Sequence, residues 1–149
     1  MKDDYNLQRF MDAQVGVYES VLAELRQGRK TGHWMWFIFP QLRGLGFSST
    51  AQFYGISSLA EASSYLEHTL LGPRLIDCTQ LVTAIEKSTL RQIFGTPDDL
   101  KFRSSMTLFA HATSENAIFI EALNKFCGGG FDPATLDRLG SGREESGGR

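Results

Sequence analysis

One stretch of the chain interleaves basic, aromatic and amide side chains in a way that suits ligand binding. Its candidate residues are Arg29, Lys30, His33, Trp34, Trp36, Gln41 and Arg43. An indole face can stack on a base or pack against a sugar, whereas a guanidinium and the N–H groups of a glycine loop can hold a phosphate or carboxylate. If the fold gathers them, these residue types predict a nucleotide-type pocket.

The same stretch is free of acidic residues. No Asp or Glu occurs from Leu25 to Ala60, although the whole chain of 149 residues has a formal charge of −2. An anion therefore prefers this segment to the rest of the chain. The alternative is structural: the tryptophans are core residues, His33 bonds within that core, and the basic side chains are solvated. Because large aromatic residues dominate core burial, the core role is favoured for each tryptophan.

A second polar group lies on a helix that is predicted to begin at Pro97. Lys101, Ser104 and Ser105 share one face of that helix. A lysine and two hydroxyls could donate hydrogen bonds to an anion, and a buried lysine with a lowered pKa could act on a carbonyl. In the favoured alternative, both serines bond back to carbonyls four residues earlier while Lys101 stays in water.

Standard catalytic and metal-binding patterns do not occur in the sequence. There is no Walker loop, GxGxxG, GxSxG, HExxH or EF-hand pattern, and the three histidines are isolated from one another. The pair Asp98-Asp99 is explained by the dipole of the helix that it begins. The sequence therefore assigns no catalytic residue and predicts no metal and no cofactor.

The elements that must position these residues read almost entirely as helices. Apolar residues recur at helical spacing with recognisable starts and glycine stops. The longest stripe is Leu71, Leu75, Cys78, Val82 and Ile85. Ser58 to Glu61 has the form of a capping box, and Thr96-Pro97 has that of a helix start. Further helices are expected around residues 7–11, 18–27, 59–68, 98–109, 118–126 and 133–139.

The block from His33 to Pro40 is apolar on every face and is expected to be buried on all sides. Its eight residues are too few to separate helix from strand by periodicity, and helix is weakly favoured. Residues 41–49 read as a loop. The predicted fold is a compact all-α single domain over residues 1–139, with about six to eight helices in an orthogonal arrangement. Residues 140–149 have no apolar anchor and are expected to be disordered.

Cysteine positions and the lengths of apolar runs predict the cellular location of the protein. The two cysteines, Cys78 and Cys127, lie at apolar helical positions and are interpreted as reduced core residues. No apolar run approaches the ~18 residues of a membrane span, and the N-terminus does not have the pattern of a signal peptide. A cytoplasmic protein that binds no membrane is predicted.

Three long strings of residues carry a family resemblance. GRKTGHWMWFIFPQLRGLGFS, AQFYGI and IFGTPDDLKFRSSMTLFA resemble the bacterial family known as domain of unknown function 1810, over about residues 4–139. The resemblance implies a compact all-α fold and brings no established activity. Gly32 and Thr69 stand where the family often has serine and proline, which implies altered local rigidity in two loops.

The leading functional hypothesis is binding, with or without turnover, of a small anionic metabolite such as a nucleotide or sugar phosphate. The alternative is a non-enzymatic helical module that docks a protein partner through an exposed aromatic or basic patch. The near-neutral charge disfavours nucleic acid, and RNA binding would need Arg26, Arg29, Lys30 and Arg43 on one surface. The sequence does not determine the oligomeric state. A pocket shared by Trp34, Gln41, Arg43 and Lys101 would favour the first hypothesis.

Overall fold

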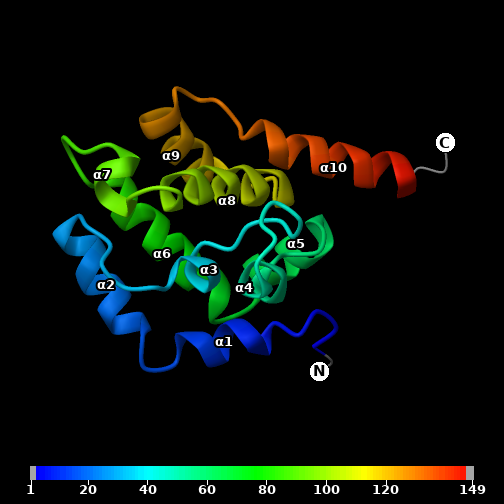
Figure 1. Cartoon of the computed structure of the whole chain (residues 1–149), viewed down its shortest axis with the longest axis horizontal. Coiled ribbons are helices and arrows are strands. Elements are labelled where there is room, and N and C mark those ends of the chain that lie inside the picture. Colours follow the sequence, from blue (N-terminus) through cyan, green and yellow to red (C-terminus); the bar gives the residue numbers. More distant parts are fainter. Residues whose placement is uncertain (1–2, 147–149) are drawn as a thin grey trace.

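The structure, a computed structural model, describes residues 3–146 of the chain, with side chains described as far as Gly140. This part folds into helices and loops without a strand, and one isolated parallel bridge pairs Leu42 with Ile56. In chain order the helices are α1 (Gln8–Gln14), α2 (Tyr18–Gln27), α3 (Met35–Ile38), α4 (Ser49–Tyr54), α5 (Leu59–Glu67), α6 (Leu71–Thr83), α7 (Leu90–Phe94), α8 (Asp98–Ala112), α9 (Ala117–Cys127) and α10 (Pro133–Ser146) (Figure 1).

The all-α prediction is confirmed, but the predicted number of six to eight helices is wrong because the described residues form ten. The extra elements are short: α3, α4 and α7 have 4, 6 and 5 residues. Helices of less than two turns cannot show a repeating apolar stripe, so periodicity misses them. Local caps mark two of them, since Ser48 and Thr89 accept hydrogen bonds from Ala51 N and Gln92 N.

The helices with long stripes lie where the sequence predicts them. Helix α6 buries Leu75, Cys78 and Val82 in the core, and α2 ends at Gly28, which adopts the left-handed conformation. Helix α8 begins at Asp98, one residue after the predicted Pro97. It runs through the middle of the molecule and packs against α5, α7, α9 and α10 (Figure 1).

The capping box predicted at the start of α5 is only half formed. Ser58 Oγ accepts from the Glu61 N–H at 3.1 Å. The Glu61 carboxylate does not return to Ser58; it accepts from Ser57 N and binds Arg9 of α1. The Glu61 side chain therefore pairs with Arg9 in place of the hydrogen bond to Ser58 N that would complete the capping box.

The C-terminal helix α10 continues to Ser146, beyond the end predicted at Leu139. The prediction of a disordered tail covers residues 140–149. Residues 147–149 lie outside the described residues, as do the side chains from residue 141 onward. That prediction therefore stays untested.

Both cysteines are free, and Cys78 is buried whereas Cys127 is half-buried. Among the described residues, no helix combines the length and the apolar character needed to cross a membrane. The cytoplasmic location stays a prediction. Nor do the described residues bring together three or more His, Cys, Asp or Glu side chains that could hold a metal ion.

The start of α6 packs directly on the end of α5 at Gly72. A Cβ at this position would lie 2.1 Å from the carbonyl oxygen of Leu66, a backbone atom that cannot move aside alone. We expect Gly72→Ala to lower the free energy of unfolding by about 1–3 kcal/mol, measured by urea denaturation.

Gly140→Ala is the matched control, because a Cβ on Gly140 of α10 would meet no atom within 4 Å. This change should be neutral or stabilise by up to about 1 kcal/mol through helix propensity. Equal midpoints for Gly72→Ala and the wild type would contradict the close contact.

Candidate functional site

Two lysines from distant parts of the chain share one carboxylate. Lys30 Nζ lies 2.9 Å from Asp98 Oδ2, and Lys101 Nζ lies 3.2 Å from Asp98 Oδ1. The Lys30 side chain is only 8% exposed, and the other two are about one-fifth exposed. We call these three residues the lysine–aspartate cluster. It holds two positive charges and one negative charge.

Backbone contacts bring Lys30 to the cluster. Lys30 lies in the loop after α2, and its N–H donates to the Ile93 carbonyl of α7 at 2.8 Å. Glu24 Oε1 holds the rest of this loop by accepting from Thr31 N and Gly32 N at 2.6 and 2.9 Å. Asp98 and Lys101 follow α7 on the first turn of α8. The cluster therefore forms where the loop after α2 crosses the α7–α8 junction.

The Asp98 carboxyl group is ionised in this setting. Partial burial works to raise its pKa, but hydrogen bonds and charge attraction from Lys30 and Lys101 outweigh burial and hold the pKa below its usual range. The two lysines therefore favour the charged form of the Asp98 carboxyl group.

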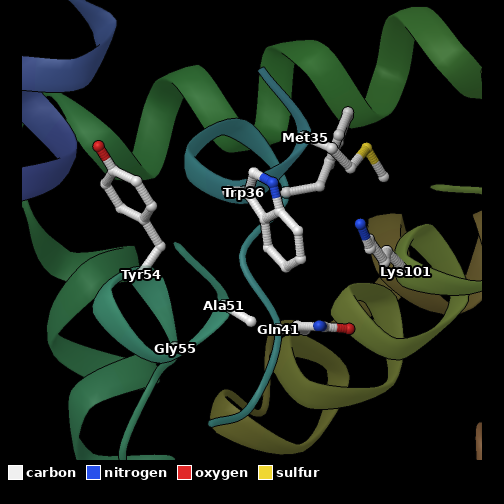
Figure 2. A pocket seen from close by; sticks show the side chains of 8 residues that line it. Met35, Trp36, Gln41, Ala51, Tyr54, Gly55 and Lys101 are labelled. Carbon is white, nitrogen blue, oxygen red and sulfur yellow. The ribbon is translucent and has the colours of Figure 1, made fainter. Parts of the chain in front are cut away.

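The Lys101 ammonium also faces an aromatic ring. Its Nζ lies 3.6 Å from the ring centroid of Trp36 on α3, which is cation–π geometry. Figure 2 shows the Trp36 ring between Tyr54 and Lys101, with the Lys101 amine turned toward the indole. Lys101 thus connects an aromatic face to the lysine–aspartate cluster.

These side chains belong to a small depression, which we call the Trp36 depression. It is lined by Met35, Trp36, Phe39, Gln41, Ala51, Tyr54, Gly55 and Lys101 (Figure 2). These side chains lie so close together that no space among them is wide enough for a water molecule. A ligand can enter only if side chains move. Trp36 and Lys101 are half-buried and therefore have solvent on one side into which they can turn.

The family described as "Protein of unknown function (DUF1810)" matches residues 4–139. The chain belongs to this family. It is also similar to a solved structure, the conserved hypothetical protein Rv1873 from Mycobacterium tuberculosis, with 58% identity and a TM-score of 0.92. The match covers 93% of this chain and 99% of that one. No curated protein matches the chain. The resemblance inferred from the three sequence strings is confirmed.

In this DUF1810 protein, part of the predicted site gathers at one place. Trp36, Gln41 and Lys101 line the Trp36 depression, and Lys30 reaches Lys101 through Asp98. These four of the ten predicted residues come from the loop after α2, from α3 and the loop after it, and from α8.

Trp34 is separate from that depression. It is 1% exposed, packs against Phe39 and Phe94, and donates its indole N–H to Glu24 Oε1 at 2.9 Å. The core explanation is confirmed for Trp34. The expectation that the whole block from His33 to Pro40 is buried is wrong, since His33 is exposed and Trp36 is half-buried. A helix of one turn at the edge of the core cannot bury all its faces.

Two other basic candidates lie outside the depression, so the pocket expected to be shared by Trp34, Gln41, Arg43 and Lys101 does not form, and only Gln41 and Lys101 of these four line it. Arg29 is exposed. The Arg43 side chain is also exposed, and its Nη2 donates to the Gly55 carbonyl at 3.1 Å. Since Gly55 lines the depression, Arg43 supports its wall from outside.

The polar face predicted on α8 is not open to solvent. Ser104 and Ser105 are buried because α8 is covered by neighbouring helices. Ser104 Oγ lies 3.1 Å from the Leu100 carbonyl oxygen, as the structural alternative predicts, and 3.0 Å from Asp132 Oδ2. Ser105 Oγ has no hydrogen-bond partner among the described residues. Ser105 and Lys101 differ from that alternative, because Ser105 makes no bond back to a carbonyl and the Lys101 ammonium contacts Asp98 and the Trp36 ring.

Sequence reasoning missed Asp98 and Tyr54 as site residues. From the sequence, Asp98 is explained by the helix dipole alone, although its i, i+3 spacing to Lys101 is a local signal of an ion pair. No comparable signal marks Tyr54, which reaches the depression from α4. The dipole and the ion pair act on the same carboxylate.

Proposed function

We propose that this protein binds a small anionic metabolite, such as a nucleotide or sugar phosphate, at the Trp36 depression. One observation carries the proposal: the Lys101 ammonium lies both against the Trp36 ring and against the carboxylate that Lys30 shares. An aromatic face next to an excess of positive charge suits a ligand with a flat or sugar part and an anionic group.

Binding requires Lys101 to leave the ring face. A cation–π contact contributes about 0.5–2 kcal/mol, so a ligand that stacks on the indole can replace it at small cost. The Lys101 ammonium would then bind the anionic group of the ligand. Gln41 supplies an amide that can donate or accept a hydrogen bond at the same wall.

The proposal predicts that nucleotides or sugar phosphates raise the melting temperature of the wild type. A ligand at 100 times its Kd stabilises the folded state by about 2.7 kcal/mol. Lys101→Met should weaken such a ligand about tenfold to a hundredfold through loss of a charge-assisted hydrogen bond of roughly 1.5–3 kcal/mol. Isothermal titration calorimetry measures that ratio.

Lys125→Met is the matched control. Lys125 on α9 also pairs with a carboxylate, Glu86, and also lies over a ring, Phe126, but it is not part of the depression. Its replacement should leave affinity unchanged. Equal affinities of Lys101→Met and wild type would contradict the proposed site, as would a library of nucleotides and sugar phosphates with no effect on melting.

A second candidate function is the docking of a protein partner near α4. Phe47 and Phe53 are 86% and 53% exposed, and exposed aromatic side chains are common in interfaces. Phe47→Ser should weaken such docking in a cross-linking assay and leave metabolite affinity unchanged, because Phe47 does not line the depression. RNA binding has less support, because one of the four cations it needs, Lys30, is held by Asp98.

A further inference from the structure

We infer that the Asp98 carboxylate occupies the place of the ligand's anionic group, and that a ligand binds by replacing it between Lys30 and Lys101. The inference rests on the proposed function and adds a ligand class and a control device. The class is a metabolite with one compact oxyanion, a phosphate monoester or a carboxylate. The device is an acidic side chain of the protein that competes with the ligand.

The geometry of the lysine–aspartate cluster sets the size of the anion. Both ammonium groups approach a single carboxylate, one at each oxygen, at 2.9 and 3.2 Å. Two cations that converge on one small group are spaced for one oxyanion. A terminal phosphate presents its oxygens in a similar way and carries more negative charge than a carboxylate, so it attracts the two lysines more strongly.

The charge balance of the cluster leaves it incompletely neutralised. Two lysines and one aspartate leave one positive charge in excess in a largely buried place. Desolvation makes such a cluster a weak source of folding stability. The same excess charge attracts an anion from solution. The segment from Leu25 to Ala60 adds no acidic side chain, and the nearby carboxylates are Asp99 on the same turn and Glu24 beside the Lys30 loop.

The Asp98 carboxylate can leave the two lysines and still be stabilised by solvent and by the N-terminus of α8. Its side chain is 20% exposed and stands on the first turn of α8, where backbone N–H groups favour a carboxylate even after it turns toward solvent. When Asp98 and the Trp36 face are both released, Lys101 is free for the ligand. Release of the Asp98 carboxylate therefore opens the anion position, and a turn of Lys101 away from the indole opens the ring face.

Isothermal titration calorimetry on the full chain tests the exchange with four probes: inorganic phosphate, AMP, ribose 5-phosphate and adenosine. Removal of a competing charge within ion-pair distance should make Asp98→Asn bind the three phosphates at least about tenfold more tightly than the wild type. The affinity for adenosine, which has no anion, should not change.

Asp99→Asn is the matched control. It removes the same charge from the same helical turn, but Asp99 accepts from Thr96 Oγ1 and makes no ion pair with either lysine. It should bind all four probes like the wild type. An equal gain in both variants would show a general effect of charge and would overturn the inference.

The outcomes separate the inference from the proposed function. If the wild type and Asp98→Asn bind AMP equally, and Lys101→Met weakens both, the proposed function stands and the inference is overturned. Weaker binding by Asp98→Asn also overturns it. If neither protein binds any phosphate probe, both the proposed function and the inference fail.

Carbon-13 NMR of the wild type gives a second measurement that does not depend on the folding of Asp98→Asn. Saturation with AMP should move the side-chain carboxyl resonance of Asp98, because the carboxylate loses both ammonium contacts. The Asp99 resonance should stay in place. A stationary Asp98 resonance at saturation would show that the carboxylate is not replaced.

Discussion

Arg9→Met should lower the free energy of unfolding by about 3–5 kcal/mol, measured by urea denaturation. The Arg9 and Glu61 side chains are 4% and 2% exposed and join at 2.8 Å. Loss of the guanidinium leaves the Glu61 carboxylate buried without its counter-charge, and breaking such a pair costs more than the pair itself contributes.

Arg9 also connects several parts of the backbone. Its guanidinium donates to four carbonyl groups, those of Tyr5, Asn6, Phe53 and Gly55. Two of these belong to the segment around Tyr54 and Gly55, which lines the Trp36 depression. We therefore expect Arg9→Met to weaken metabolite binding as well as folding.

Two variants control this prediction. Glu86→Gln removes the acid of an exposed pair with Lys125 and should change stability by about 0–1 kcal/mol. The double variant Arg9→Met with Glu61→Leu removes both buried charges and should be less destabilised than the sum of the single variants. Additive losses would show that the two side chains do not act as a pair.

Trp34→Ala should cost about 3–5 kcal/mol of unfolding free energy, because the indole fills a closed part of the core beside Phe39 and Phe94. The change also removes the hydrogen bond from the Trp34 indole N–H to Glu24. Glu24 then keeps only the hydrogen bonds from Thr31 N and Gly32 N. The loop that carries Lys30 should therefore loosen.

Trp36→Ala is the natural comparison, since it removes the same volume from a half-buried position two residues later. It should cost clearly less stability than Trp34→Ala and should weaken ligands that stack at the depression. Thermal and urea denaturation measure the first effect, and calorimetry measures the second. A greater loss of stability in Trp36→Ala would reverse the assignment of the two indoles.

The short elements show where prediction from sequence ends. The loop predicted over residues 41–49 is correct up to Ser48, which caps helix α4 and precedes its first residue, Ser49. Helix α7 has a complete capping box at Thr89 and Gln92, but it is too short for an apolar stripe. A cap residue without an apolar stripe is found both at short helices and at turns that do not continue into a helix. It therefore does not predict a short helix by itself.

The site shows the same limit in another form. Gln41, Trp36 and Lys101 were all named from their types, and the fold brings them to one depression. Ser104 and Ser105 are candidates for the same reason, but neighbouring helices cover the face of α8 on which they lie. Residue type predicts which chemistry is available, whereas accessibility depends on which neighbouring helix covers that face.

Local sequence patterns are sufficient to predict the all-α class, the family, the long helices α2 and α6 and the start of α8. These features depend on local rules of stripes, caps and glycine stops, which act within a few residues. The packing of the helices is needed to establish that Trp34 is a core residue and that Trp36 faces Lys101. It is also needed to establish that Lys30 meets Asp98. These contacts join segments far apart in the chain, and their energies depend on burial and distance, which only the packed fold sets.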